Sequence, residues 1–258
     1  METNHKLSAV IITFNEERNI ERCLKSLEHV SDEIIVVDSF STDKTQEICE
    51  KYAVRFIQNS FSGHIEQKNF AMNQASFDYV LSLDADEALD ENLTNSLLKI
   101  KETLSTFDAY YFNRLTNYCG QWIKHTGWYP DKKLRVWNKS KGAWGGENPH
   151  DRVVLREGSS KQYIKGDLLH YSYYSINDHI KQIQFFTDIS AKAAVEKGKT
   201  TTIFMIVIKP LGKFLSDYII KGGFRDGFYG FVISKTSAYA KFLKYLKIYE
   251  LNRGGKIK

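Results

Sequence analysis

The chain has 258 residues, of which 42% are hydrophobic and 14% aromatic, and its formal net charge at pH 7 is +5. This length and apolar content exclude a chain too small to bury a core, and they allow one large α/β domain with an appendage or two small domains. Residues 199–258 carry 12 basic and 3 acidic side chains, so the remainder, with 24 basic and 28 acidic ones, has a net charge of −4.

The cysteines and the N-terminus predict a cytoplasmic protein. Cys23, Cys49 and Cys119 are an odd number without a CxxC pair, and the first two fall at apolar helix positions, which is typical of reduced core thiols. The first ten residues lack a basic region followed by an apolar run and a cleavage site, so no secretory signal is predicted. No uncharged apolar run approaches the roughly 18 to 20 residues that span a bilayer.

The first part of the chain alternates strands with helices. Strands are predicted at 7–14, 34–37, 54–57 and 80–83, with helices between them, the third at 65–75. Asn15 is predicted to cap the first helix, and Ser41 or Thr42 the second. Four such alternations predict a doubly wound sheet with right-handed crossovers, whose ligands bind outside the carboxyl ends of the strands.

The acidic stretch at residues 78–91, DYVLSLDADEALDE, follows the fourth strand. Side chains two apart on a strand share a face, so Asp84 and Asp86 are expected to converge where the strand ends. Two converging carboxylates repel unless a cation neutralises them, and Mg²⁺ binds such a pair together with phosphate oxygens. The alternative is a solvated acidic turn before a helix N-terminus.

Further polar residues are expected at the same rim. Thr13 and Asn15 end the first strand and Asp38 ends the second. The Asp38 carboxylate is suited either to accept a hydrogen bond from the N–H of a nucleotide base or to cap its own turn. Lys68, on the helix before the acidic strand, faces either phosphate or solvent.

Three segments together resemble a known family. VIITFNEERNIERCLKSL, IIVVDSFSTDKT and EQKNFAMNQASFDYVLSLDADE are similar, in order and spacing, to family 2 inverting glycosyltransferases, which have the GT-A nucleotide-sugar fold. The resemblance covers about the first 155 residues. It is strongest to small bacterial enzymes like the lipooligosaccharide or lipopolysaccharide core β-1,4-glucosyltransferases, which the later stretch GWYPDKKLRVWNKSKGAWGGENPHDRVVL also resembles.

The resemblance implies a role for each matching residue. The nucleotide pocket would be formed by Thr13, Asn15 and Glu16, with Asp38 on the uracil, the pair Lys68-Asn69 near the nucleotide, Asp84 on the ribose and metal shell, and Asp86 on Mg²⁺ or Mn²⁺. The donor would be a UDP-sugar and the acceptor a glycan or glycolipid.

Direct displacement of a nucleoside diphosphate needs a base on the acceptor hydroxyl. The family commonly has a His-Glu pair where this chain has His150-Asp151, so Asp151 is the first candidate and Glu147 the substitute. A surface ion pair with Arg152 or Arg156 is the alternative role of Asp151. His170 either completes the metal shell or is simply hydrogen-bonded.

The C-terminal region changes in character. We expect a GT-A catalytic domain over residues 1–172 and a helical, basic, amphipathic region over 173–258. The helices suit an anionic membrane surface, which would make the protein peripheral on the inner face of the cytoplasmic membrane, or packing on the domain or on a second copy. Nucleic acid is not expected as a partner, since no binding module is recognised.

Two other functions match parts of the pattern. A haloacid-dehalogenase-like phosphotransferase also has aliphatic residues followed by Asp-x-Asp, but normally after its first strand. A glycan-binding protein with a decayed site would keep the fold without catalysis. Metal-dependent binding of UDP separates these alternatives from a glycosyltransferase.

Overall fold

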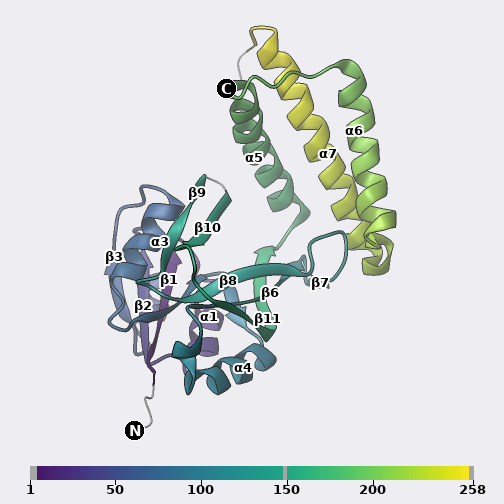
Figure 1. The fold of residues 1–258 in the computed structure, drawn as a ribbon. Coiled ribbons are helices and arrows are strands. Elements are labelled where there is room, and N and C mark those ends of the chain that lie inside the picture. The colour runs from purple at the N-terminus through teal and green to yellow at the C-terminus, as the bar shows by residue number, and fades with distance from the viewer. Residues whose placement is uncertain (1–4, 148–149, 256–258) are drawn as a thin grey trace. The chain divides into compact units, whose positions relative to one another are not determined.

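The computed structural model describes residues 5–147 and 150–255, with only the backbone of Glu147 and His150. The chain divides into two compact units, one formed by residues 1–114 and 131–171 and the other by residues 115–130 and 172–258. Figure 1 shows a sheet flanked by helices in the first unit and three long helices in the second. The second unit also contains residues 115–130, which the sequence analysis assigned to the catalytic domain.

The element order alternates strands and helices before the long C-terminal helices. The strands are β1 (Leu7–Thr13), β2 (Glu33–Asp38), β3 (Arg55–Gln58), β4 (Tyr79–Asp84), β5 (Glu87–Leu89), β6 (Ala109–Tyr118), β7 (Gln121–Ile123), β8 (Asp131–Asn138), β9 (Gly142–Glu147), β10 (His150–Leu155) and β11 (Lys161–Tyr173). The helices are α1 (Ile20–Leu27), α2 (Thr45–Cys49), α3 (His64–Asn73), α4 (Glu91–Lys101), α5 (Ile176–Glu196), α6 (Ile203–Leu215) and α7 (Gly227–Asn252), with short turns of 3-10 helix at Leu104–Thr106 and Gly223–Asp226 and of π-helix at Ser216–Ile220.

The main sheet is mixed, with the order β3-β2-β1-β4-β8-β6-β11-β5. β1 pairs in parallel with β2 and β4, and β2 with β3, whereas β8 runs antiparallel to both β4 and β6. β9 and β10 form a separate antiparallel hairpin. The predicted class, a GT-A sheet flanked by helices with a helical C-terminal extension, is confirmed.

Alternation along β1 separates two cores. Leu7, Ala9 and Ile11 pack into the cluster that includes α1 and α4, while Val10 packs into the cluster that includes α3. Figure 1 shows these helices on the two faces of the sheet. A strand buried on both faces reads as a continuous apolar run, which is why β1 was predictable.

The cysteines of the first unit are buried thiols, as predicted. Cys23 and Cys49 are both free and belong to the α1 cluster. Burial raises the pKa of the Cys49 thiol to about 12, so it stays protonated at neutral pH.

Two predicted helix caps are wrong. α1 begins at Ile20, after Asn19, while Asn15 has a φ of 54° and accepts a hydrogen bond from the Thr42 backbone N–H at 2.8 Å. Asn tolerates this left-handed conformation and binds neighbouring backbone, so it serves a turn instead of a cap. α2 begins at Thr45, after Lys44, so neither Ser41 nor Thr42 caps it. The Ser41 hydroxyl and backbone N–H both donate to Asp38 instead.

The second unit is held by polar groups as well as apolar packing. Asp226, 5% exposed, accepts from His125 through the backbone N–H and Nδ1, each at 2.7 Å. The buried His179 imidazole contacts the Tyr118 hydroxyl at 3.0 Å, and burial lowers its pKa to about 4, so the ring is neutral. Within residues 5–147 and 150–255, no helix combines the length and apolarity of a bilayer-spanning segment.

Candidate active site

Lys68 lies at the centre of the candidate site. Its side chain is buried, and its Nζ lies 3.0 Å from Asp84 Oδ1 and 2.7 Å from Asp151 Oδ2. The alternative of an exposed helix lysine is therefore wrong. One ammonium group bridges two carboxylates that are 67 positions apart in sequence, one from β4 and one from β10. The residues predicted for the diphosphate side and for base catalysis thus meet at one cation.

A second buried cation holds Asp84 from another direction. Arg135 Nη2 on β8 lies 3.3 Å from Asp84 Oδ2 and 2.6 Å from Glu87 Oε1. Glu87 in turn accepts from the Asp84 backbone N–H at 3.1 Å. Burial alone would raise the pKa of Asp84, but Lys68 and Arg135 outweigh it and hold this pKa well below its usual range. Asp84 is therefore ionised at neutral pH.

The β9–β10 hairpin is fixed on α3 by two contacts. Asn69 next to Lys68 exchanges two hydrogen bonds with the Trp144 backbone, at 2.9 and 3.0 Å. Asp151 lies opposite Gly146 in the hairpin and reaches Lys68. Adjacent residues of one helix therefore position the strand that carries the predicted base, and the Arg152 or Arg156 ion pair predicted as its alternative is not observed among the described contacts.

Asp86 and His170 form a separate pair. Asp86 lies in the turn between β4 and β5, so strand alternation does not align it with Asp84. His170 on β11 pairs with Glu87 on β5, which brings its Nε2 to 3.2 Å from Asp86 Oδ2. The expectation that a strand face aligns the two aspartates is therefore wrong, because β4 ends at Asp84.

The ends of β1 and β2 lie side by side, as the parallel pairing requires. Thr13 pairs with Asp38, and both are buried. Within the described part of the chain, Thr13 Oγ1 finds no hydrogen-bond partner. Asp38 accepts from Ser41, so it stabilises its own turn; its contact with a uracil stays a prediction.

Glu16 at this rim has a raised pKa. Its Oε2 accepts from Asn19 Nδ2 at 2.7 Å, and its backbone N–H donates to the Thr45 hydroxyl at 2.8 Å. Burial raises the pKa of Glu16 from 4.5 to about 7, and repulsion by Asp86 and other acids adds to the effect, against the opposing Asn19 hydrogen bond. Glu16 therefore resists ionisation mainly because it is buried, and the nearby acids add to this effect.

Glu16→Gln is expected to remove a loss of stability that wild type shows between pH 4.5 and 7. In that range the unfolded carboxyl ionises while the folded one keeps its proton, so the folded state is disfavoured by about 3 kcal/mol at and above pH 7. Glutamine keeps the acceptor for Asn19. Denaturant unfolding with a chelator present, at pH 4.5 and 7.5, measures the difference.

The buried His179 changes the unfolding free energy in the opposite direction over nearly the same pH range. Only the difference between wild type and Glu16→Gln therefore isolates the contribution of Glu16. Equal pH dependence in the two proteins would show that Glu16 ionises normally.

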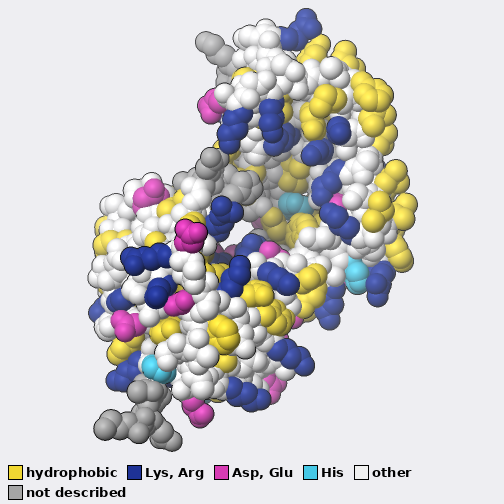
Figure 2. All heavy atoms as spheres, viewed as in Figure 1, with side chains coloured by type: hydrophobic (Ala, Val, Ile, Leu, Met, Phe, Trp, Pro, Cys, Tyr) yellow, Lys and Arg dark blue, Asp and Glu magenta, His cyan; other side chains and the backbone are white. Residues whose placement is uncertain are grey.

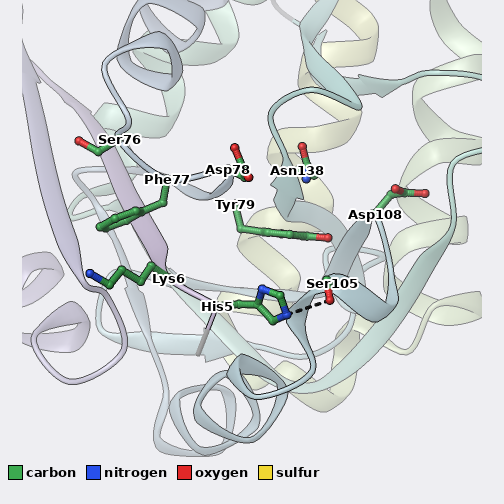
Figure 3. A pocket seen from close by; sticks show the side chains of 9 residues that line it. All are labelled: His5, Lys6, Ser76, Phe77, Asp78, Tyr79, Ser105, Asp108 and Asn138. Carbon is green, nitrogen blue, oxygen red and sulfur yellow. Dashed lines mark hydrogen bonds between the residues drawn. The ribbon is translucent and has the colours of Figure 1, made fainter. Parts of the chain in front are cut away.

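A cavity of about 500 Å³ lies at the opposite ends of the parallel strands from the candidate site. Figure 3 shows its lining, including Lys6, Tyr79 and Asp108, with His5 bonded to Ser105. Lys6 precedes β1 and Tyr79 begins β4, so this cavity lies at the amino ends of the parallel strands. Ligands of such sheets bind at the carboxyl ends, which separates this cavity from the candidate site.

The sequence did not mark Arg135 or Glu87 as site residues. Trp144 is buried, donates from Nε1 to the Ser82 hydroxyl at 3.2 Å, and has Lys68 Nζ 4.3 Å from its ring centroid. The Trp144 ring therefore packs as part of the core. The side chains of Glu147 and His150 lie outside the described residues, so the choice of Glu147 as substitute base stays a prediction.

The parallel part of the mixed sheet carries acids at the carboxyl ends of its strands, where ligands of such sheets bind, and a lysine from α3 lies beside them. The chain belongs to the glycosyl transferase family 2, whose family model matches residues 8–163. It is therefore a glycosyltransferase, and the haloacid-dehalogenase-like alternative is not favoured.

Relatives match along nearly the whole chain. An uncharacterized glycosyltransferase of Rickettsia typhi is 32% identical over 256 residues, covering 96% of this chain and 88% of its own. The lipopolysaccharide core biosynthesis glycosyltransferase LpsC of Rhizobium meliloti is 29% identical over 249 residues, covering 95% and 92%. The solved mannosyltransferase of Pyrobaculum calidifontis, in complex with GDP-Man and Mn²⁺, superimposes with a TM-score of 0.54 at 13% identity, covering 94% and 86%.

Proposed function

We propose that this enzyme moves a sugar, with glucose as the first to test, from a UDP-sugar to a bacterial surface glycan such as lipooligosaccharide core, forming a β-glycosidic bond. The observation that carries the proposal is the bridge from Asp84 through Lys68 to Asp151. It puts a donor-side carboxylate and a base candidate within one cluster. Single displacement with inversion needs such a base to take the proton of the acceptor hydroxyl. The relative named for lipopolysaccharide core biosynthesis supports the acceptor class.

A divalent cation fits the Asp86–His170 pair. A carboxylate oxygen and an imidazole nitrogen 3.2 Å apart can share an ion such as Mn²⁺ or Mg²⁺. In the described ranges no group of three His, Cys, Asp or Glu side chains is arranged to hold a metal ion, so diphosphate oxygens and water would complete the shell. When bound, the cation would stabilise negative charge on the leaving diphosphate. The mannosyltransferase neighbour was solved with Mn²⁺, which supports this cofactor class.

The chain's own residues would divide the remaining work. Asp151 would take the proton of the acceptor hydroxyl, and Lys68 would balance charge between base and diphosphate as the proton moves. Arg135 holds Asp84 in place through its ion pair. Thr13, Asn15, Glu16 and Asp38 would line the nucleotide. Each Asp38 carboxylate oxygen accepts one hydrogen bond from Ser41 and keeps a second lone pair for the N–H of a base.

Donor hydrolysis tests this function without knowledge of the acceptor. A panel of UDP-sugars and GDP-mannose is incubated with the enzyme, with and without Mn²⁺, and release of the nucleoside diphosphate is measured. Manganese-dependent release from one UDP-sugar supports the proposal. Preference for GDP-mannose would overturn the UDP assignment, and binding of a glycan with neither release nor nucleotide binding would identify a glycan-binding protein.

Asp86→Ala is expected to weaken manganese-dependent UDP binding by more than the about 10- to 100-fold typical of losing an outer-shell partner of a metal. Calorimetry with UDP and Mn²⁺ measures the change. Asp78→Ala, at the cavity at the opposite ends of the parallel strands, is the matched control and should bind as wild type does. Unchanged affinity of Asp86→Ala would remove Asp86 as a metal ligand.

Peripheral attachment to the inner face of the cytoplasmic membrane belongs to the same proposal. An acceptor built on a lipid anchor would lie at that surface. The basic helical unit is the part of the chain suited to reach it.

A further inference from the structure

An apolar surface covers the outward side of α6 in the helical unit. Its large side chains are exposed by 44 to 70%, and they are Ile203, Phe204, Val207, Ile208, Leu211 and Leu215. The spacing of three and four residues puts them on one helical face, while Ile206 on the other face is buried. Figure 2 shows hydrophobic side chains gathered along this side of the unit.

The surface continues past the end of α6. Ile219 and Ile220 in the π-helical turn are 57% and 81% exposed, and Phe228 at the start of α7 is 68% exposed. Single exposed apolar residues are ordinary, but a contiguous set of this kind marks a site that is covered in use. We call the exposed apolar residues from Ile203 to Phe228 the α6 surface.

Charge around the α6 surface has one sign. α6 contains Lys209 and Lys213 and no acid, and Arg225 is exposed beyond it. Two of the three acids after residue 198 are buried: Asp217 between Lys213 and Lys221, and Asp226 against His125. No exposed carboxylate therefore offsets the positive charge within the segment from α6 to Phe228.

We propose that the α6 surface docks on an anionic phospholipid bilayer. Its apolar face would enter the boundary between headgroups and acyl chains while Lys209 and Arg225 contact lipid phosphates. α6 has 13 residues and is therefore about 20 Å long, shorter than the about 30 Å hydrocarbon core, so it lies along the surface. A second copy is a poorer occupant, because a two-fold contact through this face would bring like charges together.

This inference rests on the proposed function in one respect: a lipid-linked acceptor would explain why the enzyme docks on a membrane. Docking itself is measured without sugar transfer. Donor hydrolysis in solution, which needs no membrane, stays the separate test of the enzymatic proposal. Either can fail alone.

Vesicle co-sedimentation of the full chain tests the docking. We expect binding to vesicles of phosphatidylcholine mixed with phosphatidylglycerol and much weaker binding to phosphatidylcholine alone. Phe204→Ser is expected to lower the partition coefficient about tenfold, and Phe204, Val207 and Leu211 changed together to Ser about a hundredfold or more.

Phe185→Ser is the matched control. Phe185 is 60% exposed, close to the 70% of Phe204, but it lies on α5, which packs on the other side of α7 from α6 (Figure 1). This control should bind vesicles as wild type does. Equal losses in both variants would overturn the assignment of the surface.

A separate variant tests the contribution of the basic side chains to vesicle binding. Lys209→Gln combined with Arg225→Gln should lower binding to the anionic vesicles about 25-fold, about fivefold for each basic residue, and leave the weak binding to neutral vesicles unchanged. Wild type that stays in the supernatant with anionic vesicles overturns the proposal. A dimer in sedimentation velocity that the triple Ser variant abolishes, with no vesicle binding, would assign the surface to self-association instead.

Discussion

Asp151→Asn is expected to leave donor binding unchanged and to lower kcat by about 100- to 10,000-fold, the usual contribution of a positioned base. The amide keeps an oxygen that accepts from Lys68, whose Nζ lies 2.7 Å from Asp151 Oδ2, so the hairpin stays on α3. It cannot take a proton from the acceptor hydroxyl. Single-turnover kinetics for chemistry and calorimetry with UDP for binding separate the two effects.

Glu147→Gln is the matched comparison, since Glu147 is the other carboxylate of the β9–β10 hairpin. It should retain most of the wild-type turnover. If Glu147→Gln loses turnover and Asp151→Asn does not, the base is Glu147. A purely structural role of Asp151 would instead appear as a lower melting temperature and weaker donor binding at similar kcat.

The parallel half of the sheet was predictable from the sequence because its central strands, β1 and β4, are buried on both faces. β1 and β4 read as continuous apolar runs that end in Thr13 and Asp84, and those ends mark the rim. Since carboxyl ends of parallel strands share an edge, the order of elements alone predicted that Asp38 would lie beside Thr13, as it does.

The antiparallel half carried weaker local signals. Arg135 is 51 positions from Asp84 and sits in a strand that reads as ordinary, so nothing nearby in sequence marks its role. The Gly-rich segment around Trp144 forms β9. A Cβ on Gly142 would lie 2.8 Å from Leu155 Cδ2, so this glycine allows close pairing of strands.

The predicted starts of α1 and α2 were wrong for a related reason. Asn15 and Ser41 both bind backbone or side chains across the rim instead of capping the helices that follow. Local propensity cannot distinguish a cap from a turn when both use the same acceptor chemistry. The burial of Lys68 could not be predicted from its neighbours in sequence either, because one of its two carboxylate partners lies on β10, far along the chain.

Lys68→Met is expected to have the largest effect on the site as a whole. Methionine fills similar space without charge, so Asp84 and Asp151 lose their shared cation and repel each other. We expect a loss of about 2 to 4 kcal/mol in unfolding free energy at pH 7, at or below the range for breaking a buried pair because the carboxylates are partly exposed. UDP affinity should fall as well, since the diphosphate loses a cationic neighbour.

Lys101→Met is the matched control for this change. Lys101 Nζ forms a comparable ion pair with Asp32 Oδ2 at 2.8 Å, but α4 carries it away from the carboxyl rim. Its removal should cost about 1 kcal/mol or less and leave UDP binding as in wild type. Because Lys68 lowers the pKa of Asp84, its stabilising effect is present above pH 3.8 and is lost as the pH falls further. The gap between wild type and Lys68→Met should therefore narrow in acid, and equal behaviour of the two Met variants would contradict a bridging role for Lys68.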